Sequence, residues 1–210
     1  MIISNQIVNT FSYKYLKKIL DIIFSIVLII IFIPIYAIIS ILIKFSSKGP
    51  ILYEWNVVGQ NGIPFKSWKF RTMRVNADEI KISLTDKNEM IGPVFKMEND
   101  PRITKLGKTL RKYSLDESIQ FFSVLIGDMS LVGPRPAGPI ELKNYKDWQR
   151  RRLSVRPGLT GPWQVSGRNK VNHFDDWVKL DLEYIDNWSI WLDIKILFKT
   201  IPAAFKGTGM

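Results

Sequence analysis

Residues 19–43 read ILDIIFSIVLIIIFIPIYAIISILI, and this stretch decides the class of fold because it is apolar over 25 residues with Asp21 as its single charge. A membrane helix needs about 20 apolar residues. A cleaved signal peptide would have an apolar region of about 7–15 residues that ends in small side chains, and the stretch has neither property. The sequence therefore predicts a helix that inserts into a membrane.

Basic residues flank the apolar stretch on both sides, namely Lys14, Lys17 and Lys18 before it and Lys44 and Lys48 after it. Lysines next to a membrane helix favour the cytoplasmic side. A helix that crosses the bilayer would carry one of these clusters to the other side, whereas a helix that enters and turns back keeps both on one side. The flanks therefore favour a re-entrant helix.

Pro34 supplies a turning point inside the same stretch, because proline removes a backbone hydrogen bond and kinks a helix. It leaves arms of 15 and 10 residues. These arms are roughly 22 and 15 Å long at the helical rise, and neither would cross a hydrocarbon core of about 30 Å. We therefore expect a break at Pro34. An ordinary spanning helix that tolerates its proline is the alternative.

The rest of the chain, residues 49–210, has the composition of a globular domain without repeats. We expect residues 1–48 to anchor it and residues 49–210 to form one catalytic domain. Within this domain, residues 51–58 predict a strand, residues 59–62 a tight turn and residues 64–72 a second extended segment. The sequence thus predicts a small β-hairpin.

Two further segments predict amphipathic helices. After Asn99-Asp100-Pro101, a helix-start sequence, Ile103, Leu106 and Leu110 recur at helical spacing among basic residues. Near the C-terminus an apolar stripe is formed by Trp188, Trp191, Ile194, Leu197, Phe198 and Ile201. Both patterns are typical of helices at a membrane surface, and both fit equally well a helix whose apolar face packs on a core.

The net charge of +11 indicates an anionic partner, and nucleic acid, anionic lipid and phosphorylated substrates would all satisfy it. The chain has no cysteine and a single histidine, His173. This composition excludes disulfides, a thiolate nucleophile and a multi-histidine metal site. Chemistry must come from carboxylates, cations and hydroxyls.

Asp116 and Glu117 form an adjacent carboxylate pair directly after a basic stretch. On spacing alone, Ser114 would cap a following helix, with Glu117 three residues on completing a capping box. In the functional interpretation, nearby cations keep both carboxylates ionised, so that one attacks phosphorus and the other holds Mg²⁺.

Two loops carry candidate phosphate-binding arginines. Arg135 lies between two prolines, which would hold its guanidinium in the fixed orientation that bidentate phosphate binding needs. Residues 156–169 form a glycine-rich loop that ends near Arg168. Neither loop is a P-loop, because GxxxxGK[ST] does not occur in the sequence.

Taken together, these blocks resemble the bacterial sugar transferases, the monotopic phosphoglycosyl transferases that begin lipid-linked glycan assembly. The matching blocks are residues 69–73 (KFRTM), 100–104 (DPRIT), 114–117 (SLDE), 127–136 (GDMSLVGPRP), 156–158 (RPG), 167–169 (GRN) and 180–181 (LD). Their order covers nearly the whole chain, which outweighs the capping interpretation of Asp116 and Glu117.

The resemblance implies an α+β, mainly helical fold with a re-entrant membrane helix, a small β element and interfacial helices. It implies that Asp116 is the nucleophile and that Glu117 binds Mg²⁺. Arg135 would bind phosphate, and further residues match positions tied to the substrate or to the structure of the site. These residues are Arg111, Arg168 and Asp181, with Lys69 and Arg71 as support for the phosphates.

The implied reaction moves a sugar-1-phosphate from a UDP-sugar to polyprenyl (undecaprenyl) phosphate through a phosphosugar-aspartyl intermediate. The implied place is the cytoplasmic face of the bacterial inner membrane, with membrane lipid as a partner, no nucleic acid, and a homo-oligomer left open. Two other functions remain: a metal-dependent glycosyltransferase that releases UDP, and a non-enzymatic basic membrane scaffold. The nucleotide released distinguishes the two enzymes.

Overall fold

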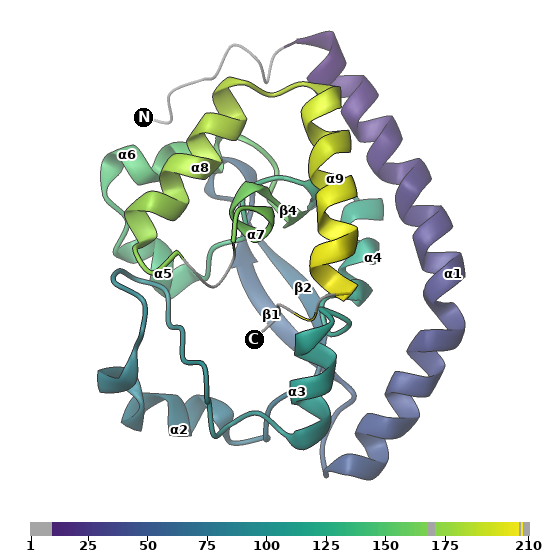
Figure 1. Ribbon diagram of the computed structural model, residues 1–210, viewed down its shortest axis with the longest axis vertical. Helices are drawn as coiled ribbons and strands as arrows, with labels where there is room; N and C mark the ends of the chain where they lie inside the picture. Colours follow the sequence, from purple (N-terminus) through teal and green to yellow (C-terminus); the bar gives the residue numbers. More distant parts are fainter. Residues whose placement is uncertain (1–9, 168–170, 206, 208–210) are drawn as a thin grey trace.

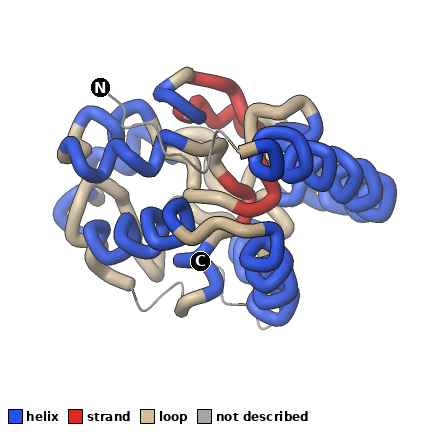
Figure 2. The backbone as a smooth tube through the Cα atoms, turned by 90° about the horizontal axis from the view of Figure 1, so that it is seen from above, coloured by secondary structure: helices blue, strands red, loops and turns tan. Residues whose placement is uncertain are grey.

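The structure, a computed structural model, describes residues 10–167, 171–205 and 207. Helices make up most of the described chain, and the strands form two small two-stranded sheets (Figures 1 and 2). The expected mainly helical α+β architecture with a small β element is confirmed.

Helix α1 spans Lys17–Ser46 and continues a short π-helical turn, Ser12–Leu16. Its ends lie two and three residues beyond those of the predicted helix 19–43. Pro34 lies inside α1 and the helix continues through it, so the expected break at Pro34 is wrong. Figure 1 shows that α1 curves around the body as one continuous helix. Within the described chain, α1 is the one helix long and apolar enough to cross a membrane.

One face of α1 is buried against the rest of the molecule at intervals of three to seven residues. The buried residues of this face are Lys17, Asp21, Ser25, Ile29, Tyr36, Ile39 and Ile43. The first three are polar, and the later ones are aromatic or aliphatic. The remaining faces expose large apolar side chains such as Ile30, Ile31 and Phe45. The helix therefore has a packed side and an apolar outer side.

Ion pairs attach the polar half of α1 to the body. The Lys17 ammonium lies 2.5 Å from a carboxylate oxygen of Asp193 and donates to the carbonyl of Val132 at 3.0 Å. Asp21 lies 3.1 Å from the Arg156 guanidinium and accepts from the backbone N–H of Leu131 at 3.0 Å. Each buried charge therefore has a partner, as burial in an apolar interior requires.

The predicted hairpin is present. Strands β1 (Leu52–Val58) and β2 (Pro64–Phe70) pair antiparallel through a turn at Gln60–Gly62, in which Asn61 adopts a positive φ of 57°. Asparagine tolerates this left-handed conformation better than most residues. At the end of β2, the backbone N–H of Phe70 donates to the carbonyl of Asp116 at 2.9 Å. The hairpin therefore fixes the position of the carboxylate pair.

A second sheet lies in the core and was not predicted from the sequence. Strand β3 (Ser130–Val132) pairs parallel with β4 (Gly158–Thr160), and both have buried residues. A Cβ at position 158 would lie 2.1 Å from the backbone nitrogen of Gly133, so the close approach of these two backbone segments requires glycine.

Helix α3 (Lys105–Lys112) confirms the predicted basic amphipathic helix but begins later than expected. Its N-cap is Thr104, whose hydroxyl accepts from the N–H of Gly107 at 2.9 Å. The expectation that the helix starts at Asn99-Asp100-Pro101 is wrong, because Asp100 instead accepts hydrogen bonds from Arg102. Leu110 is buried, and the lysines of α3 are exposed.

Helices α4 (Phe121–Leu125), α8 (Phe174–Asp186) and α9 (Ile190–Phe205) surround the core (Figure 1). The apolar stripe predicted for the C-terminal helix is divided. Trp188 and Leu197 pack on the core, whereas Trp191 and Phe198 are exposed. Four shorter helices complete the described chain: α2 (Ala77–Ser83), α5 (Pro139–Lys143), α6 (Asp147–Arg150) and α7 (Pro162–Val165).

Candidate active site

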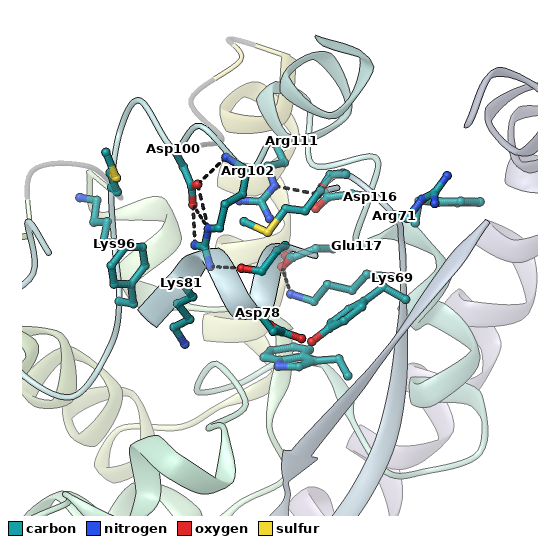
Figure 3. A pocket seen from close by; sticks show the side chains of 18 of the residues that line it. Lys69, Arg71, Asp78, Lys81, Lys96, Asp100, Arg102, Arg111, Asp116 and Glu117 are labelled. Carbon is teal, nitrogen blue, oxygen red and sulfur yellow. Dashed lines mark hydrogen bonds and ion pairs between the residues drawn. The ribbon is translucent and has the colours of Figure 1, made fainter. Parts of the chain in front are cut away.

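A cavity of about 640 Å³ lies between the hairpin, α2, α3 and α8 (Figure 3). Both signs of charge line it, with more basic than acidic residues. The basic residues are Lys69, Arg71, Arg74, Lys81, Lys96, Arg102, Arg111 and Arg135, and the acidic ones are Glu54, Asp78, Asp100, Asp116, Glu117 and Glu141. This excess of cations gives the cavity the charge expected of an anion-binding site.

Asp116 and Glu117 lie in a turn between α3 and the 3₁₀ turn Ser118–Gln120. Ser114 has a positive φ of 55°, and the next helical residues start at Ser118 without a side-chain cap. The capping-box interpretation is therefore wrong. Asp116 is 7% exposed and reaches the cavity, so the pair is held by a constrained turn and not by a helix surface.

Lys69, from the end of β2, forms an ion pair with Glu117. Its ammonium lies 2.6 Å from the Oε1 atom of Glu117 and 3.6 Å from the centre of the Trp55 ring. Burial lowers the pKa of the Lys69 ammonium, and the Glu117 carboxylate opposes that shift. The structure thus brings Lys69 to the carboxylate pair (Figure 3), and the phosphate support that the resemblance implies for it stays a prediction.

Arg111 supplies a second fixed cation from the last turn of α3. Its Nε atom donates to the hydroxyl of Thr72 at 2.8 Å, which orients the guanidinium. Burial lowers the pKa of Arg111, while the nearby carboxylate of Asp116 raises it. Because an arginine stays protonated at every physiological pH, Arg111 contributes a permanent positive charge beside Asp116.

Arg135 approaches the cavity from the loop between β3 and α5. Its guanidinium carbon lies 5.4 Å from the ring centre of Trp55 and 5.9 Å from that of Trp177. Within the part of the chain that the structure describes, this guanidinium forms no ion pair. A cation held by aromatic rings and left without a carboxylate is available to an anionic ligand.

Arg71 also lines the cavity, but it and two other predicted site residues are not shown beside the carboxylate pair. Arg71 donates to the carbonyls of Ser47 and Lys48 at 2.8 and 2.5 Å, so its guanidinium holds the end of α1 and lies apart from the carboxylate pair in Figure 3. Asp181 is fully buried behind the cavity. Arg168 lies outside the described residues.

Asp100 and Arg102 form a part of the site that sequence reasoning left without a role. Arg102 donates from Nη2 to Asp100 at 2.5 Å and from Nε to both carboxylate oxygens at 2.9 and 3.0 Å. Its guanidinium carbon lies 5.0 Å from the ring centre of Phe95. The sequence feature that could have revealed this pair is Asp-Pro-Arg at residues 100–102. The proline between the two charged residues turns the chain, so that their side chains can meet.

Mg²⁺ is the metal that the resemblance implies, and the donors present fit it. Among the described residues no group of three or more His, Cys, Asp or Glu side chains gathers as a metal cluster. Mg²⁺ is commonly held by one or two carboxylates, with water and substrate phosphate oxygens as the other ligands. Asp116 and Glu117 supply such a pair, and Lys69 shares one oxygen of Glu117.

A cavity with adjacent carboxylates and an excess of cations is typical of enzymes that bind anionic groups. The family model described as bacterial sugar transferase matches residues 12–207, and the chain belongs to that family. The described part of the matched range contains α1, the hairpin and the cavity.

Three relatives illustrate the similarity. The chain is 54% identical over 161 residues to galactosyl transferase CpsE of Streptococcus agalactiae, a match that covers 77% of this chain and 36% of the relative. It is 44% identical to undecaprenyl-phosphate galactose phosphotransferase of Salmonella typhimurium, over 94% of this chain and 42% of the relative. It is 41% identical to the exopolysaccharide production protein ExoY of Rhizobium meliloti, over 92% of this chain and 87% of the relative. The chain therefore spans well under half of the first two relatives and most of the third.

Proposed function

We propose that this protein transfers a sugar-1-phosphate from a UDP-sugar to undecaprenyl phosphate through a covalent intermediate on Asp116. The observation that carries the proposal is the carboxylate pair of Asp116 and Glu117 in a cavity lined by Lys69, Arg111 and Arg135. The name of the Salmonella relative, an undecaprenyl-phosphate galactose phosphotransferase, supports the reaction class.

In the first half-reaction, a carboxylate oxygen of Asp116 attacks the phosphorus that carries the sugar. The bond from this phosphorus to the bridging oxygen breaks, and UMP leaves with that oxygen. A carboxylate that approaches a diphosphate must overcome repulsion between anions, and positioned cations reduce it. Arg111 and Lys69 lie beside the carboxylates for this task, and Arg135 is available to the diphosphate.

In the second half-reaction, a phosphate oxygen of the lipid attacks the same phosphorus. The bond to Asp116 breaks, the carboxylate is restored, and the product is a lipid diphosphate sugar. We assign the orientation of the incoming phosphate to Glu117, whose carboxylate accepts a hydrogen bond from Lys69. Bound Mg²⁺, held by Glu117 with Asp116 beside it, would neutralise phosphate charge.

We also propose that α1 enters the cytoplasmic membrane and returns to the same side. Both ends of the helix contact one folded body, because Lys17 pairs with Asp193 and the carbonyls of Ser47 and Lys48 accept from Arg71. A through-span would place one of those ends on the far side of the membrane and break its contacts with the body. The outer apolar faces of α1 and of α9, where Trp191 and Phe198 are exposed, would then contact lipid.

The nucleotide that leaves tests the reaction. Purified full-length protein in lipid nanodiscs is incubated with undecaprenyl phosphate and a panel of UDP-sugars, and nucleotides are separated by chromatography. We expect UMP release and a mass increase of one sugar phosphate on the peptide that contains Asp116. An Asp147→Asn variant, changed at an exposed carboxylate far from the cavity, should behave as wild type. Release of UDP would instead identify a glycosyltransferase that transfers sugar alone.

Cysteine labelling tests the topology, and the natural lack of cysteine makes the experiment clean. Single cysteines at Thr10 and Lys48 are exposed to a membrane-impermeant maleimide in oriented inner-membrane vesicles. We expect both to react from the cytoplasmic side only. Reaction of the two positions from opposite sides would contradict a re-entrant helix and leave the proposed reaction untouched.

A further inference from the structure

The loop that carries Arg135 is held by backbone hydrogen bonds on both sides of that residue. The N–H of Gly158 donates to the carbonyl of Pro134 at 2.8 Å, and the N–H of Val58 donates to the carbonyl of Ala137 at 2.9 Å. Between these points, the carbonyl of Arg135 itself accepts from a side chain, the Nη2 atom of Arg152, at 3.1 Å.

Arg152 is a buried cation whose other hydrogen bonds are with residues outside the Arg135 loop. The same Nη2 atom lies 2.5 Å from a carboxylate oxygen of Asp181, and Nη1 donates to the hydroxyl of Tyr145 at 2.8 Å. The side chains of Arg152 and Asp181 are 3% and 0% exposed. The pair is therefore sealed from solvent and cannot touch a substrate in the cavity.

Arg152 also lies beside the ring that Arg135 approaches. The guanidinium carbon of Arg152 is 5.7 Å from the ring centre of Trp177, and that of Arg135 is 5.9 Å from the same centre. Trp177 lines the cavity from α8, the helix that also carries Asp181. One buried guanidinium thus contacts both the backbone of Arg135 and an aromatic neighbour of its side chain.

Stability alone does not explain this arrangement. A buried ion pair often contributes no more to folding than apolar side chains of the same volume would. Apolar side chains, however, could not donate a hydrogen bond to the carbonyl of Arg135. The feature that apolar side chains would lack at this position is the bond to the Arg135 loop.

We propose that Arg152 is a positioning residue: held by Asp181 and Tyr145, it fixes the backbone and the ring that direct the Arg135 guanidinium toward the diphosphate of the donor. This inference rests on the proposed function for the identity of the donor. It assigns Asp181 to the support of Arg152 and away from contact with substrate.

A double-mutant cycle with Arg135 tests the proposal, with UDP as the binding probe and UMP release as the kinetic readout. In full-length protein, Arg152→Lys is expected to weaken UDP binding about tenfold, the equivalent of one charge-assisted hydrogen bond. In an Arg135→Ala background the same substitution should cause no further loss, because Arg152 acts through Arg135. The thermal midpoint should fall equally in both backgrounds.

The matched control is Arg151→Lys, the same chemical change one residue earlier, where the side chain pairs with Asp186 at the surface. It should leave UDP binding unchanged. If Arg152→Lys does not fold, Tyr145→Phe removes the hydroxyl that Arg152 contacts and retains the ring. Its smaller loss of UDP affinity should also disappear in the Arg135→Ala background.

A full-sized loss in the Arg135→Ala background, or normal UDP affinity in a folded Arg152→Lys variant, would overturn the positioning role. The two proposals fail separately. A wild type that binds UDP but releases no UMP would refute the proposed reaction, and the binding cycle would still decide the role of Arg152. A wild type that does not bind UDP would refute both.

Discussion

Charged residues in the cavity and charged residues in the interior are arranged differently in this molecule. In the cavity, the side chains of Lys69 and Glu117 are 15% and 20% exposed, and Arg135 has aromatic neighbours but no carboxylate among the described residues. In the interior, the Lys17–Asp193 pair is 3% and 13% exposed. The guanidinium of Arg135 thus keeps capacity for a ligand, whereas the interior charges are used on the fold. Substitutions in the two regions should therefore change different properties.

The largest effect on activity is expected for substitution of Asp116, where activity should fall and stability should hardly change. Asp116→Asn removes the proposed nucleophile, so we expect sugar-phosphate transfer to fall at least about a thousandfold. Stability should hardly change, because asparagine has nearly the same shape. The measurements are transfer of radiolabelled sugar to the lipid fraction and the thermal unfolding midpoint. Turnover within tenfold of wild type would exclude Asp116 as the nucleophile.

A smaller but still large loss is expected for Arg135→Lys. The substitution keeps the charge, but an ammonium cannot form the paired hydrogen bonds that a guanidinium forms with a diphosphate. We expect kcat/KM for the nucleotide-sugar to fall about a hundredfold. Arg150→Lys, on the exposed surface of α6, is the control and should be neutral. Equal kinetics for the two variants would argue against phosphate binding by Arg135.

A substitution in the interior should instead lower the stability and leave the activity nearly unchanged. Lys17→Met leaves the buried carboxylate of Asp193 without its ammonium, and breaking a buried pair in this way lowers the free energy of unfolding by about 3–5 kcal/mol. Lys66→Met, at an exposed pair with Glu54, should lower it by about 0–1 kcal/mol. Thermal unfolding measures both, and activity per folded molecule should remain near wild type. A Lys17→Met variant as stable as Lys66→Met would show that the buried ion pair contributes no more to stability than the exposed one.

The smallest effect is a pH dependence of stability that originates at Asp181. Burial raises the pKa of Asp181 from 3.8 to about 6, although the Arg152 guanidinium opposes the shift. Because the folded carboxyl holds its proton more tightly than the unfolded one, its contribution to stability is full below about pH 4 and is lost as the pH rises through about 6.

We therefore expect the thermal midpoint of wild type to fall between pH 5 and pH 7 by more than that of Asp181→Asn, whose side chain does not titrate. The difference should correspond to about 1–2 kcal/mol. Parallel pH profiles for the two proteins would show that Asp181 has an unshifted pKa. Measurements on Asp147→Asn, at an exposed carboxylate, provide the baseline.

The sequence predicted those features that depend on neighbouring residues. The apolar run of α1, the turn between β1 and β2 and the basic face of α3 all follow from local periodicity or turn chemistry. The family resemblance assigned Lys69 and Arg111 to the site, and the structure places Lys69 against Glu117 and Arg111 near Asp116, while their roles toward the substrate stay predictions. Local patterns failed at Ser114, where a positive φ replaced the expected helix cap.

Features that depend on distant residues could not be predicted in this way. The parallel pair β3–β4 joins strands of three residues each, too short to show any periodicity. The family resemblance implied that Arg71 supports the phosphates. The end of α1 instead offers free carbonyls to its guanidinium, and only the folded chain shows this. The partner of Asp181 likewise comes from another element, at Arg152.

The buried charged residues of α1, Lys17 and Asp21, also determine when the helix can form its final contacts during synthesis. Asp21 finds its hydrogen-bond partner Ser130 after 109 further residues, and Lys17 finds Asp193 after 176. At about 5–20 residues per second, the ribosome needs roughly ten to thirty seconds to deliver that last partner. Until then, this segment carries a lysine and an aspartate that lack these partners. The contacts that attach α1 to the rest of the protein therefore form late in its folding.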